Sequence, residues 1–239
     1  NIIIVMNHLV SVIIPSFNRF EFLLNAIESV QSQTYKNFEI IVVNDNSKDE
    51  RYYKKSFTKN VNIIHLENEN KEQKGPGNVR NIGIESAKGD FVAFLDDDDI
   101  WMEDKLEIQL EAMHSKRLKF SSTEGYFGEG VFNPKENYQL YNKEKFYKKI
   151  KTKYKGTKYL KKGYPQIWDF EFLKIHNCVI TSSVIVEKRL LNLLGGFRNI
   201  PGGVEDYDCW LGLLRLTNLA YVDTPLFYYD GSHGDGRNY

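Results

Sequence analysis

Short, almost continuous runs of apolar residues recur along the first hundred positions, and polar residues follow each run. These runs cover residues 9–14, 38–43, 61–66 and 91–95. They predict strands that are buried on both faces of a sheet. Apolar residues at helical spacing predict helices over 20–33 and 78–87 between them. This alternation predicts an α/β fold of βαβ units with a mostly parallel, Rossmann-like sheet.

The second half of the chain is less regular. The elements predicted there are a helix at 102–118, a strand at 179–186, a helix at 188–194, a helix at about 207–216 and a strand at 220–222. Residues 120–165 are rich in Lys, Tyr, Gly and Asn and show little apolar periodicity. Because no internal repeat and no linker marks a boundary, we expect a single domain over residues 1–239.

Three polar clusters, at 15–19, 44–47 and 96–99, directly follow predicted strands. Ligands of parallel α/β sheets bind beyond the carboxyl ends of the strands, so we expect the clusters to converge there. The last cluster, Asp96 to Asp99, is four adjacent carboxylates. They repel one another unless a cation or water solvates them, and hard oxygen ligands suit Mg²⁺ or Mn²⁺. A solvated acidic turn is the alternative, and the expected convergence favours the metal site.

Composition narrows the possible partners. The 32 basic and 32 acidic residues cancel, which predicts no general affinity for nucleic acid. Charge is nevertheless segregated, since residues 143–162 hold ten lysines and one acid, Glu144. Two cysteines make no disulfide framework and fit a cytoplasmic protein, either free or peripheral to a membrane. The apolar start, residues 1–6, is too short to span a bilayer, and we expect neither a leader nor a transmembrane segment.

Six motifs in order resemble the family 2 glycosyltransferases of the GT-A fold. They are residues 12–19 (VIIPSFNR), 42–47 (VVNDNS), 77–84 (GNVRNIGI), 89–99 (GDFVAFLDDDD), 195–197 (GGF) and 203–211 (GVEDYDCWL). The resemblance covers roughly residues 9–118 and 176–230. It implies a nucleotide-binding half at about 9–105 and an acceptor-binding half at about 106–239. It also implies an inverting, metal-dependent transfer from a nucleotide sugar.

The resemblance assigns the nucleotide sugar to the motifs of the first half. It implies that Asp45 accepts a hydrogen bond from uracil N3–H, which would select a UDP-sugar. An ordinary turn role for Asp45 stays open, and the family more often has Asp where Asn44 stands. The other residues implied for the nucleotide sugar are Pro15, Ser16, Phe17 and Arg19 for the base and ribose, and Gly77 and Arg80 for the diphosphate and sugar. Amide groups at a helix N-terminus suit phosphate, although Gly75-Pro76-Gly77 also fits a plain loop.

The aspartate run resembles the Asp-x-Asp metal motif of this family. Alternation along extended backbone would place Asp96 and Asp98 on one side and Asp97 and Asp99 on the other. We expect Asp98 to ligate Mn²⁺ or Mg²⁺, and Asp96 or Asp97 to hold the ribose or a metal-bound water. The run of four leaves this register ambiguous by one residue. His233 resembles a further ligand from a C-terminal loop, and an ordinary surface histidine is the alternative.

Glu205 and Asp206 stand where the family carries its catalytic acid pair. Inverting transfer needs a base that takes the proton of the acceptor hydroxyl, and we expect Asp206 in that role with Glu205 beside it at the acceptor. A purely structural role at a helix N-terminus is the alternative. The family also has Arg where Gly212 stands.

The acceptor does not follow from these motifs. We expect a glycan, a lipid-linked sugar or a protein, and the oligomeric state is open. The Lys- and Tyr-rich segment 135–165 is either a solvated insertion or an acceptor-recognition flap, and His176 is either structural or on the acceptor side. Two other functions remain as alternatives. A nucleotidyltransferase would normally carry a Gly-rich loop after the first strand, and a silent binding module would lack acids such as Asp98 or Asp206.

Overall fold

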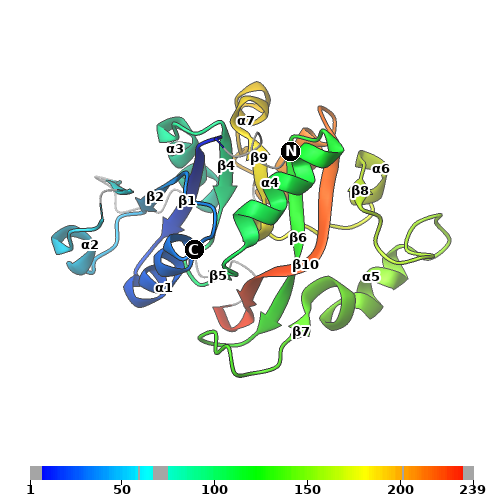
Figure 1. Ribbon diagram of the computed structural model, residues 1–239, viewed down its shortest axis with the longest axis horizontal. Coiled ribbons are helices and arrows are strands. Elements are labelled where there is room, and N and C mark those ends of the chain that lie inside the picture. The colour runs from blue at the N-terminus through cyan, green and yellow to red at the C-terminus, as the bar shows by residue number, and fades with distance from the viewer. Residues whose placement is uncertain (1–6, 59, 67–74, 201, 234–239) are drawn as a thin grey trace.

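The computed structural model describes residues 7–58, 60–66, 75–200 and 202–233. Its strands are β1 (Val10–Ser16), β2 (Phe38–Asn44), β3 (Val61–His65), β4 (Phe91–Phe94), β5 (Ile100–Trp101), β6 (Phe120–Gly128), β7 (Gln139–Leu140), β8 (Ile167–Trp168), β9 (Ile185–Glu187) and β10 (Leu219–Asp230). Within the described residues they form one mixed sheet in the order β3-β2-β1-β4-β9-β6-β10-β5, with β7 beside β6 and β8 beside β10 (Figure 1). The predicted α/β fold is thus confirmed.

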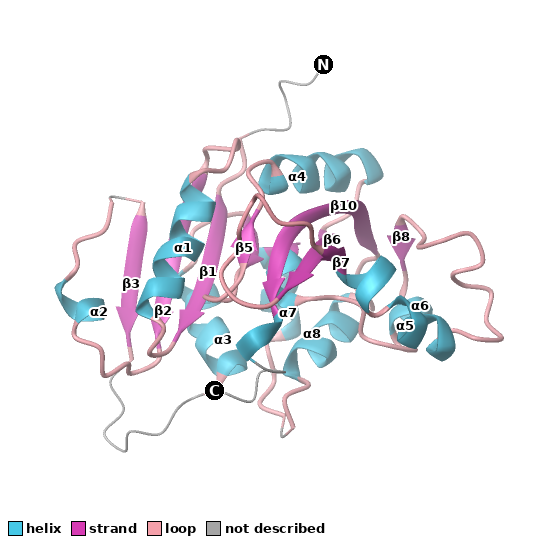
Figure 2. Ribbon diagram, turned by 90° about the horizontal axis from the view of Figure 1, so that it is seen from below, coloured by secondary structure: helices cyan, strands magenta, loops and turns pink. Residues whose placement is uncertain are grey.

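Helices cover both faces of this sheet. They are α1 (Phe20–Gln31), α2 (Arg51–Lys54), α3 (Pro76–Ser86), α4 (Lys105–Lys116), α5 (Tyr147–Lys153), α6 (Phe170–Leu173), α7 (Lys188–Leu194) and α8 (Glu205–Leu213), with the short turns η1 (Tyr141–Lys145), η2 (Thr181–Ser183) and η3 (Gly231–His233). Figure 2 shows α1 and α4 on one side of the sheet and α3, α7 and α8 on the other. In the part of the chain that the structure describes, no helix is long and apolar enough to cross a bilayer.

Two hydrophobic clusters fill the space between the layers. Val12 and Ile14 of β1 pack with Leu23 and Leu106 of α1 and α4. Ile13, between them in sequence, belongs to the opposite cluster under α3, α7 and α8. Successive side chains of a strand point to opposite faces, so a strand covered on both faces must be apolar throughout. This requirement explains the continuous apolar runs of the sequence.

The parallel part of the sheet brings the polar clusters together as predicted. Strand β1 pairs in parallel with β2 and with β4, and Ser16 is opposite Asn44 at the end of one pair. The loops beyond these strands are then bonded to each other. The Asn18 backbone N–H donates to Ser47 Oγ at 2.9 Å, and the Asn18 side chain accepts from the Lys48 N–H at 2.8 Å.

Strand β6 was not predicted, because its centre is polar. Ser121, Ser122 and Glu124 are all fully buried. Gln109 of α4 donates to the Ser121 hydroxyl at 2.8 Å, and Ser122 bonds Ser183 of η2 at the same distance. Buried polar groups are stable when such partners are present, but the partners lie on other segments and leave no local pattern.

The predicted strand over 179–186 is wrong in its first part. Residues 181–183 form a 3₁₀ turn, and only Ile185–Glu187 pair as β9. Ser183 stabilises this turn, since both its backbone N–H and its hydroxyl donate to the Ile180 carbonyl, at 2.9 and 2.6 Å. The hydroxyl competes for a carbonyl that a strand would pair, which is the usual effect of serine near backbone.

A fully buried lysine, Lys105, lies beneath the sheet ends. Its Nζ donates to Gln109 Oε1 at 2.6 Å and lies 4.0 Å from the centre of the Trp101 ring. The aromatic face favours a desolvated ammonium by about 2 kcal/mol or somewhat more. Burial of a charge costs several kcal/mol. The desolvation effect is larger, and burial lowers the pKa of Lys105 well below its usual value.

Asn81 of α3 joins the Gly195-Gly196-Phe197 motif to the helix. Its Nδ2 donates to the Phe197 carbonyl and its Oδ1 accepts from the Phe197 N–H, both at 2.8 Å. Gly196 has φ +73°, and a Cβ there would lie 2.3 Å from Asn81 Oδ1. The motif therefore needs glycine both for its backbone conformation and for this contact.

We predict that Asn81→Ala lowers the free energy of unfolding by about 1–3 kcal/mol, because it leaves the Phe197 N–H and carbonyl without their side-chain partner. Urea denaturation measures this difference. The exposed Asn133→Ala is the matched control and should change stability by less than about 0.5 kcal/mol. Equal effects of the two substitutions would contradict the role of the Asn81 amide.

We also predict that Lys105→Met changes how stability depends on pH. Between the lowered pKa of Lys105 and its unfolded value of 10.5, the unfolded chain binds a proton that the folded chain releases. The contribution of Lys105 to the stability of the wild type then rises with pH in that window, by at most about 1.4 kcal/mol per unit. Urea denaturation at neutral and alkaline pH should show this slope reduced in the variant and kept in the exposed control Lys88→Met. An unchanged slope in Lys105→Met would count against a neutral lysine.

Candidate functional site

The four aspartates form a turn directly beyond β4. The Asp99 N–H donates to the Asp96 carbonyl at 3.1 Å, which closes a β-turn. Asp97 and Asp99 are buried, whereas Asp96 and Asp98 keep part of their surface exposed. The predicted separation of the run into two sides is present, although a turn and not extended backbone produces it.

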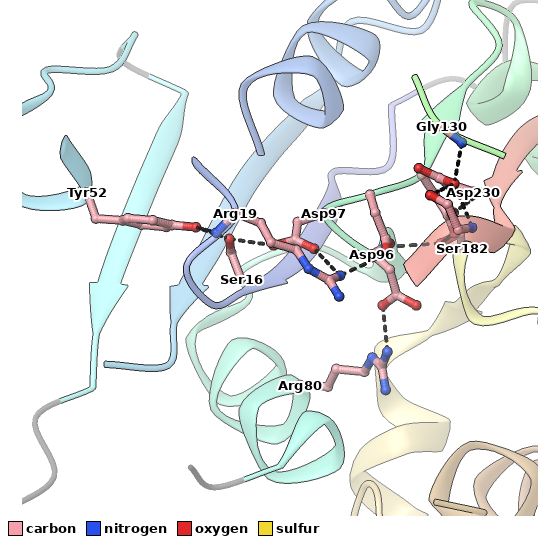
Figure 3. A network of polar contacts seen from close by, with 12 residues as sticks. Ser16, Arg19, Tyr52, Arg80, Asp96, Asp97, Gly130, Ser182 and Asp230 are labelled. Carbon is pink, nitrogen blue, oxygen red and sulfur yellow. Dashed lines mark hydrogen bonds and ion pairs between the residues drawn. The ribbon is translucent and has the colours of Figure 1, made fainter. Parts of the chain in front are cut away.

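Asp97 is bound by the loop between β1 and α1 (Figure 3). The Ser16 hydroxyl donates to Asp97 Oδ2 at 2.6 Å, and Arg19 Nη1 lies 3.3 Å from Oδ1. Tyr52 completes this corner, because its hydroxyl lies 2.5 Å from Ser16 Oγ and accepts from the Arg19 N–H at 3.0 Å. Burial, followed by the charge of Asp98, raises the pKa of Asp97 to about 7. In this structure Asp97 holds the loop, and its contact with a nucleotide stays a prediction.

Asp99 anchors the other end of the turn. The Ser182 hydroxyl donates to its Oδ2, and the Asp230 N–H donates to its Oδ1 at 3.0 Å. Ser182 also accepts from the Asp96 N–H at 3.0 Å, and Asp230 accepts from the Gly130 N–H at 2.8 Å. Burial, followed by the charges of neighbouring aspartates, raises the pKa of Asp99 well above its usual value. The turn is therefore fixed from η2 and from β10 at once.

The two outward aspartates each face an arginine. Asp98 Oδ2 lies 2.8 Å from Arg19 Nη1, and Asp96 Oδ1 lies 2.5 Å from Arg80 Nη2. No group of three or more metal-ligating side chains occurs among the described residues. A divalent ion at Asp98 therefore stays a prediction, because it would need its other ligands from substrate phosphates and water, an arrangement that Mg²⁺ often has.

Asp45, the residue expected to contact uracil, is fully buried together with Ser16 and Pro15. The neighbouring Asn44 accepts the Ser47 N–H at 3.0 Å, which fixes the turn after β2. A base could reach the Asp45 carboxylate only if neighbouring side chains move. The uridine contact therefore stays a prediction, and so does the role expected for Phe17, which is partly buried at the end of β1.

Arg80 links the aspartate run to the acid pair. Its guanidinium is almost fully buried; Nη2 lies 2.5 Å from Asp96, and Nη1 lies 3.8 Å from Glu205 Oε1. The N-terminus of α3 is equally close to α8, since a Cβ on Gly77 would lie 2.9 Å from Glu205 Cγ. Only a residue without a side chain fits there. The structure thus brings together motifs that are more than a hundred residues apart.

Asp206 lies in the first turn of α8, on the same side as the buried residues of this helix. The Tyr207 N–H donates to its Oδ1 at 2.6 Å, and Asn177 Nδ2 lies 3.5 Å from its Oδ2. Burial is the largest influence and raises the pKa of this carboxyl, against the lowering effects of the Tyr207 N–H and Arg80. A partly desolvated carboxylate with a raised pKa is a stronger base than an exposed one, as general-base catalysis requires.

The side chain of His233 lies outside the described residues, so its metal role stays a prediction. Its backbone closes η3, which follows the Asp230 that bonds Asp99. Several residues that contribute to the site had no expected role, among them Tyr52, Asn81, Asn177, Ser182 and Asp230. Ser182 could have been found from the sequence, because it lies in a polar triplet, residues 181–183, inside an apolar run. Asn81 lies in the motif at residues 77–84. No pattern in the sequence marks Tyr52 or Asn177.

Comparison with known proteins agrees with this geometry. A family model, glycosyl transferase family 2, matches residues 11–184. An Escherichia coli protein named UDP-Glc:alpha-D-GlcNAc-diphosphoundecaprenol beta-1,3-glucosyltransferase WfgD is 32% identical over 91% of this chain and 74% of its own length. An uncharacterized glycosyltransferase of Rickettsia felis is 34% identical over 91% of this chain. The chain spans 32% of that relative's length.

Solved structures show the same fold at low identity. The Staphylococcus aureus TarS fragment 1–349 in complex with UDP-GlcNAc has a TM-score of 0.69 at 19% identity, over 96% of this chain and 60% of that one. A Pyrobaculum calidifontis mannosyltransferase with GDP-Man and Mn²⁺ has a TM-score of 0.64 at 16% identity, over 93% and 57%. Fold, site geometry and sequence agree, and the chain belongs to glycosyl transferase family 2.

Proposed function

We propose that this chain is a catalytic domain that moves a sugar from a UDP-sugar to an acceptor hydroxyl with inversion. The observation that carries the proposal is the position of Arg80 between Asp96 and Glu205, at 2.5 and 3.8 Å. A diphosphate bound at this side chain would lie beside the acid pair. Reaction of an acceptor with the donor's anomeric carbon requires this proximity.

The nucleotide sugar would lie over the strand ends. Ser16 and Arg19 come from the end of β1 and the loop after it, and Arg80 and Gly77 come from the first turns of α3. The buried guanidinium and the N–H groups of that helix start are a suitable environment for a diphosphate. The full set proposed for the donor is Pro15, Ser16, Phe17, Arg19, Asp45, Gly77, Arg80, Asp96 and Asp97.

A divalent ion would be held by Asp98, and by His233 if that side chain reaches it. When bound, Mn²⁺ or Mg²⁺ supplies charge that offsets the negative charge developing on the diphosphate leaving group. The mannosyltransferase of the same fold was solved with Mn²⁺, which supports the choice of ion. Arg19, 2.8 Å from Asp98, would share that carboxylate or move toward the donor.

Asp206 is proposed as the base. Its carboxylate takes the proton of the acceptor hydroxyl as the oxygen attacks C1 from the face opposite the nucleotide, and UDP leaves with the bonding electrons. Asn177 orients the carboxylate, and Glu205 contacts the acceptor. The Escherichia coli relative is named for a β-glucosyl transfer from UDP-Glc onto a diphosphoundecaprenol-linked sugar. Since UDP-glucose is the α anomer, that name supports inversion and a lipid-linked acceptor here. We propose that the reaction takes place in the cytoplasm, at the surface of a membrane.

We predict that Asp206→Asn lowers the rate of sugar transfer by about 10²–10⁴-fold, the usual contribution of a positioned base. The matched control is Asp208→Asn on the same helix, whose carboxylate faces Arg198 near the surface. Both variants lose one carboxylate of α8, and only the first should lose transfer. Full activity of Asp206→Asn would remove this residue from the mechanism.

The role of Asp206 as base also predicts how the reaction depends on pH. The base must be deprotonated, and burial raises its pKa above the usual 3.8, so kcat/KM should fall with decreasing pH at a higher pH than an exposed aspartate would allow. The midpoint of the fall of kcat/KM at acidic pH should be the same in the wild type and in Asp208→Asn.

A further inference from the structure

The Lys-rich segment 143–162 is a built part of the fold and not a loose insertion. The buried Glu124 carboxylate accepts the N–H groups of Asn142 and Lys143 at 3.0 and 3.1 Å, which anchors η1 to β6. Ile150 and Tyr154 belong to the hydrophobic core. One side of the segment is thus buried, and most of its lysines are exposed.

These lysines form an unbalanced positive surface. Nine are exposed: Lys145, Lys148, Lys149, Lys151, Lys153, Lys155, Lys158, Lys161 and Lys162. The tenth, Lys143, pairs with Asp223 at 2.7 Å. No carboxylate of the described residues pairs with the nine. Like charges repel one another, so a surface of this kind favours an anionic ligand.

The segment is packed against the site through α6. Tyr154 donates to the Phe172 carbonyl at 2.9 Å, and its ring lies 4.9 Å from the Phe172 ring. From the other side, Tyr207 of α8 donates to the Leu173 carbonyl at 2.8 Å. Figure 2 shows α5 and α6 toward one end of the molecule and α8 nearer its middle.

Two of the lysines lie near His176, the residue that precedes Asn177. Lys149 and Lys153 are one helical turn apart on α5, on the same face. Burial lowers the pKa of His176, and the charges of Lys149 and Lys153 lower it further. The next residue, Asn177, contacts Asp206 at 3.5 Å. The Tyr154 hydroxyl, next to Lys153 in sequence, also lies 3.5 Å from the His176 carbonyl, so this end of α5 adjoins the loop that contacts Asp206.

We infer that Lys149 and Lys153 bind a phosphate group of the acceptor, which is therefore a phosphate-linked sugar and not a neutral glycan. This inference rests on the proposed function. Lysine ammonium groups bind phosphate as mobile point charges, and two on one helix face suit a diphosphate. The remaining lysines raise the local concentration of such an anion.

The test compares two acceptors with the same sugar, a short-chain N-acetylglucosamine diphosphate ester and the neutral alkyl glycoside. We expect Lys149→Gln/Lys153→Gln to raise the KM for the diphosphate ester at least tenfold, with the KM for the donor and the kinetics of the neutral glycoside unchanged. The matched control is Lys158→Gln/Lys162→Gln, which removes the same charge from the loop after α5. An effect no larger than that of the control would overturn the inference.

Two further measurements distinguish a phosphate site from a general contact with anionic membranes. In vesicle sedimentation with phosphatidylglycerol, loss of vesicle binding by the double variant with an unchanged KM for the diphosphate ester would overturn the inference.

Binding can also be followed without turnover, by NMR titration of His176 in protein saturated with UDP and excess Mg²⁺. Inorganic pyrophosphate should raise the pKa of His176 in the wild type and not in Lys149→Gln/Lys153→Gln. If no acceptor is turned over, the proposed function fails, and this titration still decides the phosphate site. If pyrophosphate left the pKa of His176 unchanged in the wild type, the inference of a phosphate site would be overturned.

Discussion

The site depends on the ion pairs that the buried guanidinium of Arg80 makes with Asp96 and Glu205. A charge removed from water is stable only with opposite charges and hydrogen-bond acceptors around it, and loss of one partner costs several kcal/mol. Asp96 and Glu205 supply that charge from the end of β4 and the start of α8. The same requirement explains why the Gly77 and Gly196 contacts are so close: α3, which carries Arg80, must approach α8 and the Gly195-Gly196-Phe197 motif without side chains between them.

The aspartate run divides into two buried and two partly exposed members. Asp97 and Asp99 hold the turn from opposite sides, through Ser16 and Ser182. The outward pair, Asp96 and Asp98, then faces the space beyond the strands with its geometry already fixed. Fixed carboxylates need little reorganisation when a charged ligand arrives, which is the general advantage of a preorganised polar site.

The sequence predicted the parallel part of the sheet well, because strands covered on both faces must be apolar along their whole length. It failed where buried polar residues replace that pattern. Ser121 and Glu124 made β6 resemble a loop, and Ser183 broke a predicted strand into a turn. The motif residues Arg80, Asp96 and Glu205 were foreseen and do lie together. Tyr52 and Asn177 were not, since a single tyrosine or asparagine acquires its role only from residues that the fold brings near.

We propose that this protein carries out a metal-dependent transfer from a UDP-sugar. The most direct measurement follows nucleotide release across a set of UDP- and GDP-sugars, each with Mn²⁺ and with EDTA. We expect turnover of UDP-sugars with Mn²⁺ that is lost in EDTA. Turnover that persists in EDTA would contradict the metal role of Asp98, and a preference for GDP-sugars would contradict the role of Asp45.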